Sequence, residues 1–369
     1  MHFKTLLLLD VPETKQNPEW EKEVQQKMDE FKAKHPGEII ENAVLGLYIG
    51  KLTNVQTTFG LELSKLIYSV MERFYCSTED PKYLLFEDRT EEYLQSFNAE
   101  VECVVMPDGK IREVHDYVFM RDFVVKDGKI YQKFGDTLKR STTARRMRLL
   151  PNYPRSKLYG SFDEYVEDEG GCKNEETGKY GEWYNPNSVY DWFSIGGRWP
   201  EMFLVKLDCT DYSYGERSSM DESRYPAPAG YRWVACARKK DIQGQAMREW
   251  RNQQTRERFY KLEKMFQSGE IDDSVHRITE EGLFWCAQMI YRKGQTVEEF
   301  MAKHGIPDSW KYPINVCGVF TEEEYFDEHD HPYDPAIEGD QEAKWRVQLE
   351  EFIDDADDET VFVGIDYHM

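Results

Sequence analysis

The segment from Asn185 to Pro200 (NPNSVYDWFSIGGRWP) contains the side chains of this chain that are best suited to bind a ligand. In an extended segment alternate side chains share a face, and the Gly196–Gly197 turn would let Asp191 reach back to Arg198. An Asp–Arg pair beside tryptophans suits a nucleotide-like ligand. A guanidinium stacked on tryptophan can equally fasten a loop onto a core. The structural interpretation is favoured, because no phosphate-binding glycine motif or nucleophile accompanies the segment. The candidate ligand-binding residues are Tyr190, Asp191, Trp192, Arg198 and Trp199.

A second group of residues has the types that bind a divalent metal. The segment 327–334 (DEHDHPYD) places His329 and His331 on one side of an extended chain, with carboxylates nearby. Zinc or manganese would suit these ligands, and Asp366 and His368 of the last predicted strand share a face that could complete the site. The favoured alternative is a solvated acidic turn and a polar strand face. We therefore expect no cofactor, with a divalent metal as the alternative.

Charge is distributed unevenly along the chain, which carries a net charge of −23. The segment 137–157 has seven basic residues and no acidic one, and 237–264 has nine basic against four acidic residues. We expect these basic side chains to pair with the protein's own acids, and direct binding of nucleic acid is not expected. Carboxylates along a helix imitate a row of phosphates to a basic partner. The candidate partner-binding residues are Glu350, Glu351, Asp354, Asp355, Asp357 and Asp358.

Cysteine spacing and hydropathy indicate the cellular compartment in which the protein works. The seven cysteines are widely spaced without a CxxC pair, which predicts reduced thiols. Cys103, Cys236 and Cys286 lie in apolar runs typical of strands, where cysteine behaves as a small hydrophobe. No run approaches the ~18 apolar residues of a membrane span, and the apolar run Leu6–Leu9 is too short for a signal peptide. These features predict a cytoplasmic protein that does not bind membranes.

The pattern of elements predicts an α+β fold. Strands are expected at 2–9, 201–207, 230–237, 283–291, 316–320 and 360–367, and helices at 60–76, 91–97, 241–267, 297–304 and 340–355. A meander of antiparallel strands is expected over 101–134. The prolines in 149–155 indicate a domain boundary, so we predict an N-terminal domain 1–150 with the meander and a C-terminal domain 151–369 with the aromatic segment. Antiparallel sheets with helices packed on one side are favoured, with ferredoxin-like subdomains as one such arrangement.

Three segments resemble a family of uncharacterised proteins in phages, prophages and bacteria. NPNSVYDWFSIGGRW resembles the family's NPNxKWDWYxIGGRW element, MHFKTLLLL at 1–9 its MSHFTVLVI-like start, and VGIDYHM at 363–369 its VVDCHI-like end. Tyr367 stands where the family has Cys, and a GxMGWWG-like segment is missing or altered near 315–321. The family has no established activity. The resemblance therefore implies the context of a mobile genetic element.

Two functional hypotheses follow. The leading one is a non-enzymatic phage or mobile-element protein that binds a host protein with a basic surface through its own acidic surface, as a counter-defence inhibitor. The alternative is an enzyme, either metal-dependent at His329, His331, Asp366 and His368, or acting on a nucleotide-like ligand at the aromatic segment.

Overall fold

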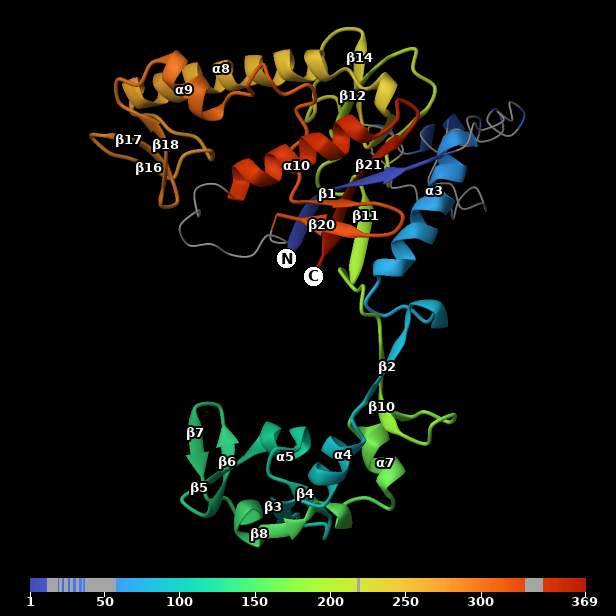
Figure 1. Ribbon diagram of the computed structural model, residues 1–369. Coiled ribbons are helices and arrows are strands. Elements are labelled where there is room, and N and C mark those ends of the chain that lie inside the picture. The colour runs from blue at the N-terminus through green and yellow to red at the C-terminus, as the bar shows by residue number, and fades with distance from the viewer. Residues whose placement is uncertain are drawn as a thin grey trace. The chain divides into compact units, whose positions relative to one another are not determined.

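The protein has an α+β fold that divides into two compact units (Figure 1). The structure, a computed structural model, describes residues 1–11, 58–217, 220–328 and 341–369, with a few single positions between 19 and 36. The first unit combines residues 1–76 with 187–369, and the second comprises residues 77–186. The candidate ligand residues of the aromatic segment and the acidic C-terminal helix all belong to the first unit.

The core of the first unit is a seven-stranded sheet built around the two ends of the chain. β1 (His2–Leu9) and β21 (Val361–His368) pair antiparallel over their whole length, from His2 opposite His368 to Leu9 opposite Val361. β19 (Gly318–Phe320) lies parallel to β1 and is followed by β20 (Tyr325–Asp327). The other edge of β21 pairs with β15 (Cys236–Arg238) and with β11 (Trp192–Ile195), and β13 (Tyr212–Ser213) extends β15. The expected strands at 2–9 and 360–367 are thus central and adjacent (Figure 1).

Both faces of this sheet are covered by helices. Leu7 and Ile365 pack with Ile67 of α3 (Thr58–Met71) on one face. On the other face Leu6 and Phe362 pack with Trp345 of α10 (Gln341–Asp355) and with residues of α8 (Gly244–Ser268). The central sheet therefore differs from the expected arrangement, in which helices pack on one side of a sheet. Strands at the middle of a sheet can be apolar on both faces, and β21 is buried from Val361 to Tyr367.

Two smaller sheets complete the first unit. β12 (Phe203–Lys206) and β14 (Tyr231–Val234) pair antiparallel as a two-stranded sheet. β16 (Arg277–Ile278), β17 (Gly282–Trp285) and β18 (Gln288–Arg292) pack against α8 and α9 (Val297–His304). The strand expected over 283–291 is therefore two strands, and Cys286 lies in the turn between them with a φ of 50°.

The second unit contains three small sheets. The first joins β2 (Leu85–Asp88), β10 (Tyr180–Tyr184) and β9 (Cys172–Lys173), beside α4 (Thr90–Phe97) and α7 (Phe162–Asp168). The second joins β4 (Ile111–Glu113), β3 (Glu100–Val105) and β8 (Arg148–Pro154). The third joins β5 (Phe123–Lys126), β6 (Lys129–Phe134) and β7 (Thr137–Lys139), with α5 (Tyr117–Asp122) and α6 (Thr142–Arg146) contributing to its core. Single-turn 3-10 helices lie at Glu72–Phe74, Pro81–Tyr83, Arg155–Lys157 and Lys239–Asp241.

Two expectations about this region differ from the structure. The meander is interrupted because Asp116 caps α5 by accepting a hydrogen bond from the Val118 N–H, and Phe119 of α5 is buried. The boundary expected near residue 150 falls inside β8, whose residues pair with β3. The chain instead divides at Ser77 and at Pro186, so the second unit is an insertion within the first.

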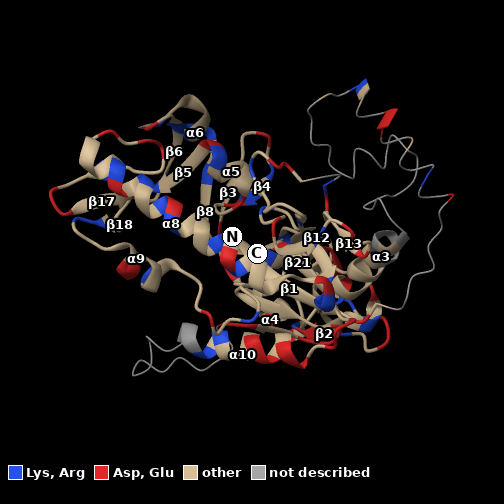
Figure 2. Ribbon diagram, turned by 90° about the horizontal axis from the view of Figure 1, so that it is seen from above, with Lys and Arg blue, Asp and Glu red and all other residues tan. Residues whose placement is uncertain are grey.

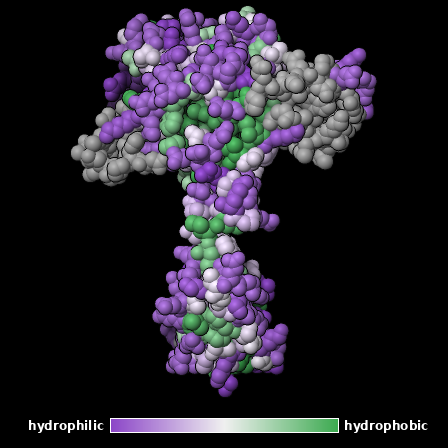
Figure 3. Space-filling view, turned by 45° about the vertical axis from the view of Figure 1, so that its right-hand side comes forward, coloured by the Kyte–Doolittle hydropathy of each residue, from purple (hydrophilic) through white to green (hydrophobic). Residues whose placement is uncertain are grey.

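The exterior is mostly hydrophilic in the view of Figure 3, in keeping with a mean hydropathy of −0.74. Of the helices in the part of the chain that the structure describes, none has the length and apolar character needed to cross a bilayer.

Candidate functional site

One face of the central sheet changes from apolar to polar along its strands. On β1 this face runs from Leu8 and Leu6 in the core to Lys4 and His2, and on β21 it runs from Phe362 to Asp366 and His368. β11 adds Trp192 opposite His368, and Ser194 opposite Asp366. Strand periodicity therefore gathers polar groups from three neighbouring strands at one end of the sheet. We call this region the polar sheet end, defined by His2, Lys4, Asp191, Trp192, Asp366 and His368.

Two histidine–carboxylate pairs lie side by side at the polar sheet end. His2 Nδ1 is 3.0 Å from Asp366 Oδ1, and His368 Nδ1 is 2.9 Å from Asp191 Oδ1. The two imidazole rings are edge to face with their centroids 5.1 Å apart. A carboxylate accepts the proton on Nδ1, which leaves each Nε2 as the atom available to a ligand. No hydrogen bond to either Nε2 occurs within the described ranges of the chain.

Asp366 is held in place by the Gly196–Gly197 turn. Its side chain is only 1% exposed, and besides His2 it accepts a hydrogen bond of 3.0 Å from the Arg198 backbone N–H. Gly197 has a φ of 43°, and a Cβ at this position would lie 2.5 Å from both Cβ and Oδ2 of Asp366. Only glycine allows the turn to approach the carboxylate so closely. The GGRW sequence thus orients Asp366, and through it His2.

A charged layer lies between the histidines and the apolar core. Burial and, to a smaller extent, the nearby Arg251 guanidinium together lower the pKa of Lys4 to about 8, while Glu201 and Cys317 oppose the shift. Burial also lowers the pKa of Arg251, which donates to the carbonyl oxygens of Pro313 and Glu201, each at 3.2 Å. Oε2 of Glu201 is buried and makes no hydrogen bond with the residues that the structure describes. The ammonium of Lys4 therefore loses its proton more readily than that of an ordinary lysine.

Some side chains of the aromatic segment are buried and stabilise the fold, whereas others are exposed. Tyr190 is 4% exposed and donates to the Met71 carbonyl, and Trp199 is partly buried against the core cluster that contains Leu6 and Phe362. Trp192 is 50% exposed, with its ring edge to face against His2 at 5.7 Å. The expected contact between Asp191 and Arg198 is not formed, because Asp191 pairs with His368 on the adjacent strand. The Arg198 side chain is exposed and has no ion pair among the residues described.

The structure describes only two of the four residues that the metal hypothesis names. His329 and His331 lie outside the described residues. Asp366 and His368 do share one face of β21, as expected, but each is engaged by a different partner. In the ranges that are described, no group of three or more His, Cys, Asp or Glu is arranged to hold a metal ion.

The acidic residues of α10 and the turn after it differ in their surroundings. Glu350 accepts from Arg346, with Oε1 2.9 Å from Nη2, and Asp354 lies 3.6 Å from the Lys311 ammonium. The other four make no ion pair with any described residue. These four exposed residues are Glu351, Asp355, Asp357 and Asp358. Figure 2 shows the acidic residues of α10 in red.

The two basic segments also differ from each other. In 237–264 several cations are paired as expected: Arg238 with Asp211 at 2.8 Å, Lys240 with Glu359 and Lys261 with Asp272. In 137–157 only Arg155 forms an ion pair with a described residue, Glu113 at 2.7 Å. The expectation of self-pairing therefore fails for 137–157, part of which is visible as the blue α6 in Figure 2.

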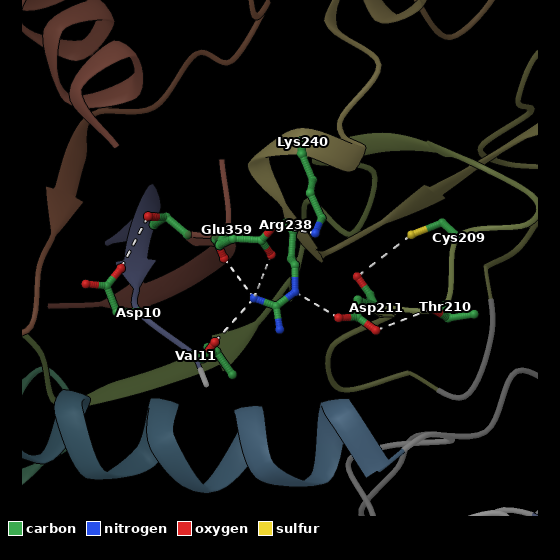
Figure 4. A network of polar contacts seen from close by, with 9 residues as sticks. Asp10, Val11, Cys209, Thr210, Asp211, Arg238, Lys240 and Glu359 are labelled. Carbon is green, nitrogen blue, oxygen red and sulfur yellow. Dashed lines mark hydrogen bonds and ion pairs between the residues drawn. The ribbon is translucent and has the colours of Figure 1, made fainter. Parts of the chain in front are cut away.

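The buried Arg238 organises a polar network next to a cavity (Figure 4). Its guanidinium donates to the Asp211 carboxylate and to the carbonyl oxygens of Val11 and Glu359, tying β15 to the ends of β1 and β21. The neighbouring cavity of about 460 Å³ is lined by both carboxylates and amines, among them Asp208, Asp211, Asp241, Lys206 and Lys240. Of the charged groups that line it, Asp211 pairs with Arg238 and Lys240 pairs with Glu359. We therefore assign the network a structural role.

Sequence reasoning missed two features. His2 and Lys4 are predicted only as part of the strand 2–9, although their alternation ahead of Leu6 and Leu8 indicates a strand face that changes from polar to apolar. Cys103 and Cys236 are buried as expected, but Cys286 is exposed. Its Sγ lies 3.5 Å from His276 Nδ1, across the turn that the expected single strand concealed.

Comparison with protein-family models, with curated proteins and with solved structures finds no match for this chain. The geometry of the polar sheet end therefore has to carry the functional argument by itself.

Proposed function

We propose that the polar sheet end binds a small nucleotide-like anion and that His2 and His368 act on it as a general acid–base pair. The observation that carries the proposal is the pair of carboxylate-oriented imidazoles, 5.1 Å apart between ring centroids. A carboxylate on Nδ1 fixes the tautomer and makes Nε2 the atom that exchanges a proton with the ligand. One neutral and one protonated imidazole would supply a base and an acid in the same step.

Neighbouring groups suit the ligand class. Trp192 is 50% exposed beside His2, and an exposed indole ring suits stacking by a base. The exposed Arg198 follows the turn that holds Asp366, and its guanidinium suits a phosphate. Lys4 adds a second cation on the same face, in register with Asp366.

A panel of mononucleotides and cyclic nucleotides, screened by calorimetry and then for turnover by phosphorus NMR, tests this proposal. We expect one class to bind, and Trp192→Ala or His368→Gln to weaken binding about tenfold or more. Trp183→Ala is the matched control, because Trp183 is 51% exposed and lies in the other unit. Turnover should follow a bell-shaped pH profile that the histidine substitutions abolish. If no member binds at millimolar concentration, or Trp183→Ala weakens binding as much as Trp192→Ala, the proposal is wrong.

A second candidate function is binding of a basic host protein through the acidic end of α10, as in a counter-defence inhibitor carried by a phage or other mobile element. It is favoured by the four exposed carboxylates without an ion pair among the described residues. Changing Glu351, Asp355, Asp357 and Asp358 to their amides should abolish a complex that dissociates at high salt. A complex that survives both treatments would exclude the charge-based mechanism.

A further inference from the structure

The sheet β5–β6–β7 of the second unit has one face in the core and one open face. Phe123, Val125 and Ile130 point into the core formed with α5 and α6. The strand register places Val124 opposite Tyr131 and Lys133 opposite Leu138 on the other face. Because side chains alternate across a strand, the open face also carries Lys126 and Lys129, which are opposite each other. We call this surface, defined by Val124, Lys126, Lys129, Tyr131, Lys133 and Leu138, the lysine face.

No lysine of this face forms an ion pair with a described residue. Lys126, Lys129 and Lys133 are exposed, and Lys133 Nζ donates to the Met120 carbonyl oxygen at 2.5 Å. Asp122 precedes the Phe123–Gln132 pair, so the register carries it toward Lys133, but its ion pair is with Arg121, whose hydrogen bond lowers the Asp122 pKa more than the Lys133 charge does. Asp127 and Asp136 are in turns. The charge of the lysine face is therefore available to a partner.

Charge of the same sign surrounds the lysine face. Residues 121–157 include eleven basic and three acidic residues, a net charge of +8 within a chain of net charge −23. Apart from Arg121 and Arg155, these basic residues form no ion pair within the described part of the chain. At the end of β6, on the opposite face of the sheet, the Lys139 ammonium lies over the Phe134 ring at 5.6 Å, and Phe134 is 49% exposed. The lysine face itself carries the partly exposed ring of Tyr131 among its cations.

We propose that the lysine face binds single-stranded nucleic acid. Along β6, Lys129, Tyr131 and Lys133 follow one another at ~6.7 Å intervals on one face, which places a ring between two cations. Sheet surfaces that bind single strands use this combination: bases stack on aromatic rings while cations hold the phosphates. Nucleic acid uses both features of this face, because its phosphates pair with the lysines and its bases stack on the ring between them. This site is separate from the polar sheet end, which lies in the other unit.

Fluorescence anisotropy of the full chain with a labelled oligothymidylate of about 16 nucleotides tests the proposal. We expect binding at about 50 mM salt, with a log–log salt slope near −2 for three phosphate contacts at about −0.7 each. The triple variant K126Q/K129Q/K133Q should bind at least about tenfold more weakly, with a slope near zero. Tyr131→Leu should weaken binding about tenfold and leave the slope unchanged.

The matched control removes three exposed lysines of the other unit, K264Q/K293Q/K303Q, and so changes the net charge by the same amount. It should retain wild-type affinity within about twofold, and thermal unfolding should confirm that all variants fold. Four results would overturn the proposal: no binding by the wild type at low salt, equal weakening in the two triple variants, no effect of Tyr131→Leu, or stronger binding to polyglutamate or anionic vesicles than to the oligonucleotide. The His368 variant tests the proposed function through its binding of mononucleotides. Its result leaves the proposal for the lysine face unaffected.

Discussion

The polar sheet end and the lysine face hold charge in opposite ways. At the polar sheet end each carboxylate has a histidine partner, and Asp366 is almost completely enclosed by the Gly196–Gly197 turn. On the lysine face three exposed lysines have no carboxylate partner among the described residues. Enclosed charges depend on local geometry, whereas exposed charges act through the field around them and are screened by salt. Charged side chains therefore support fixed chemistry at the polar sheet end and salt-dependent attraction at the lysine face.

The largest effect on stability should come from Gly197→Ala. The new Cβ would displace Asp366 from its hydrogen bonds, and a φ of 43° disfavours alanine, so we expect a loss of about 2–4 kcal/mol in the free energy of unfolding. Gly230→Ala is the control, because Gly230 has a φ of 87° but open space around it. It should cost only the conformational strain, about 1 kcal/mol. Urea denaturation that gave equal losses for both variants would show that the turn does not enclose Asp366.

A smaller effect should follow from the buried amine of Lys4. Its pKa is about 8 in the folded chain against 10.5 for an ordinary lysine in the unfolded chain, so between these pH values the unfolded chain binds more protons than the folded one. Stability should therefore rise with pH across this window, by on the order of 1 kcal/mol per pH unit from this group, while below pH 8 the cost of burying the charge is fully present. Lys4→Met should remove the rise and be more stable than the wild type at pH 7. Unfolding curves at pH 7 to 10 for both proteins measure the difference, and parallel pH profiles would contradict it.

Glu350→Gln should have a modest effect, since it breaks the ion pair with the largely enclosed Arg346. We expect a loss of about 0.5–1 kcal/mol. Glu351→Gln on the same helix should change stability by less than about 0.5 kcal/mol, because Glu351 is exposed and unpaired within the described residues. Thermal unfolding distinguishes the two, and a larger loss for Glu351→Gln would mean that the assignment of paired and free carboxylates on α10 is wrong.

The smallest effect on stability should come from the lysine face itself. The variant K126Q/K129Q/K133Q removes three charges but little packing, so its free energy of unfolding should lie within about 0.5 kcal/mol of the wild type. A loss of more than about 2 kcal/mol would show that these lysines support the fold, and the contrast with the polar sheet end would then disappear.

Much of the fold could be predicted from local patterns. The α+β class is confirmed, and α9 coincides with the expected helix 297–304, where Thr296 and Glu299 form a capping box. The helix expected over 60–76 is α3 followed by a 3-10 turn. Of the five apolar residues at helical spacing that predict it, Leu63, Ile67 and Phe74 are buried and Leu66 and Val70 are partly buried. Periodicity and caps act within one element, so they can be recognised without knowledge of the rest of the chain.

The candidate site can be predicted only in part, because the local sequence of a strand does not indicate with which distant strand it pairs. Asp366 and His368 were placed on one face correctly, but nothing near His2 indicates that β1 pairs with β21 from end to end. Asp191 was assigned to Arg198, its neighbour across the turn, whereas the strand pairing brings it to His368. The insertion of the second unit between Cys76 and Asn187 was concealed for the same reason. The β1–β21 pairing, the Asp191–His368 contact and the inserted unit all depend on contacts between residues far apart in the sequence.

The central claim is that His2 and His368 form a ligand site, and NMR of the protein with ¹⁵N-labelled histidine tests it most directly. Before ligand is added, both imidazoles in their neutral form should carry the proton on Nδ1, because each Nδ1 faces a carboxylate. On titration with the nucleotide that binds in calorimetry, the signals of His2 and His368 should shift and saturate together, while those of the exposed His115 and His276 stay in place. Unchanged His2 and His368 signals at saturating nucleotide, or neutral rings protonated on Nε2, would contradict the account.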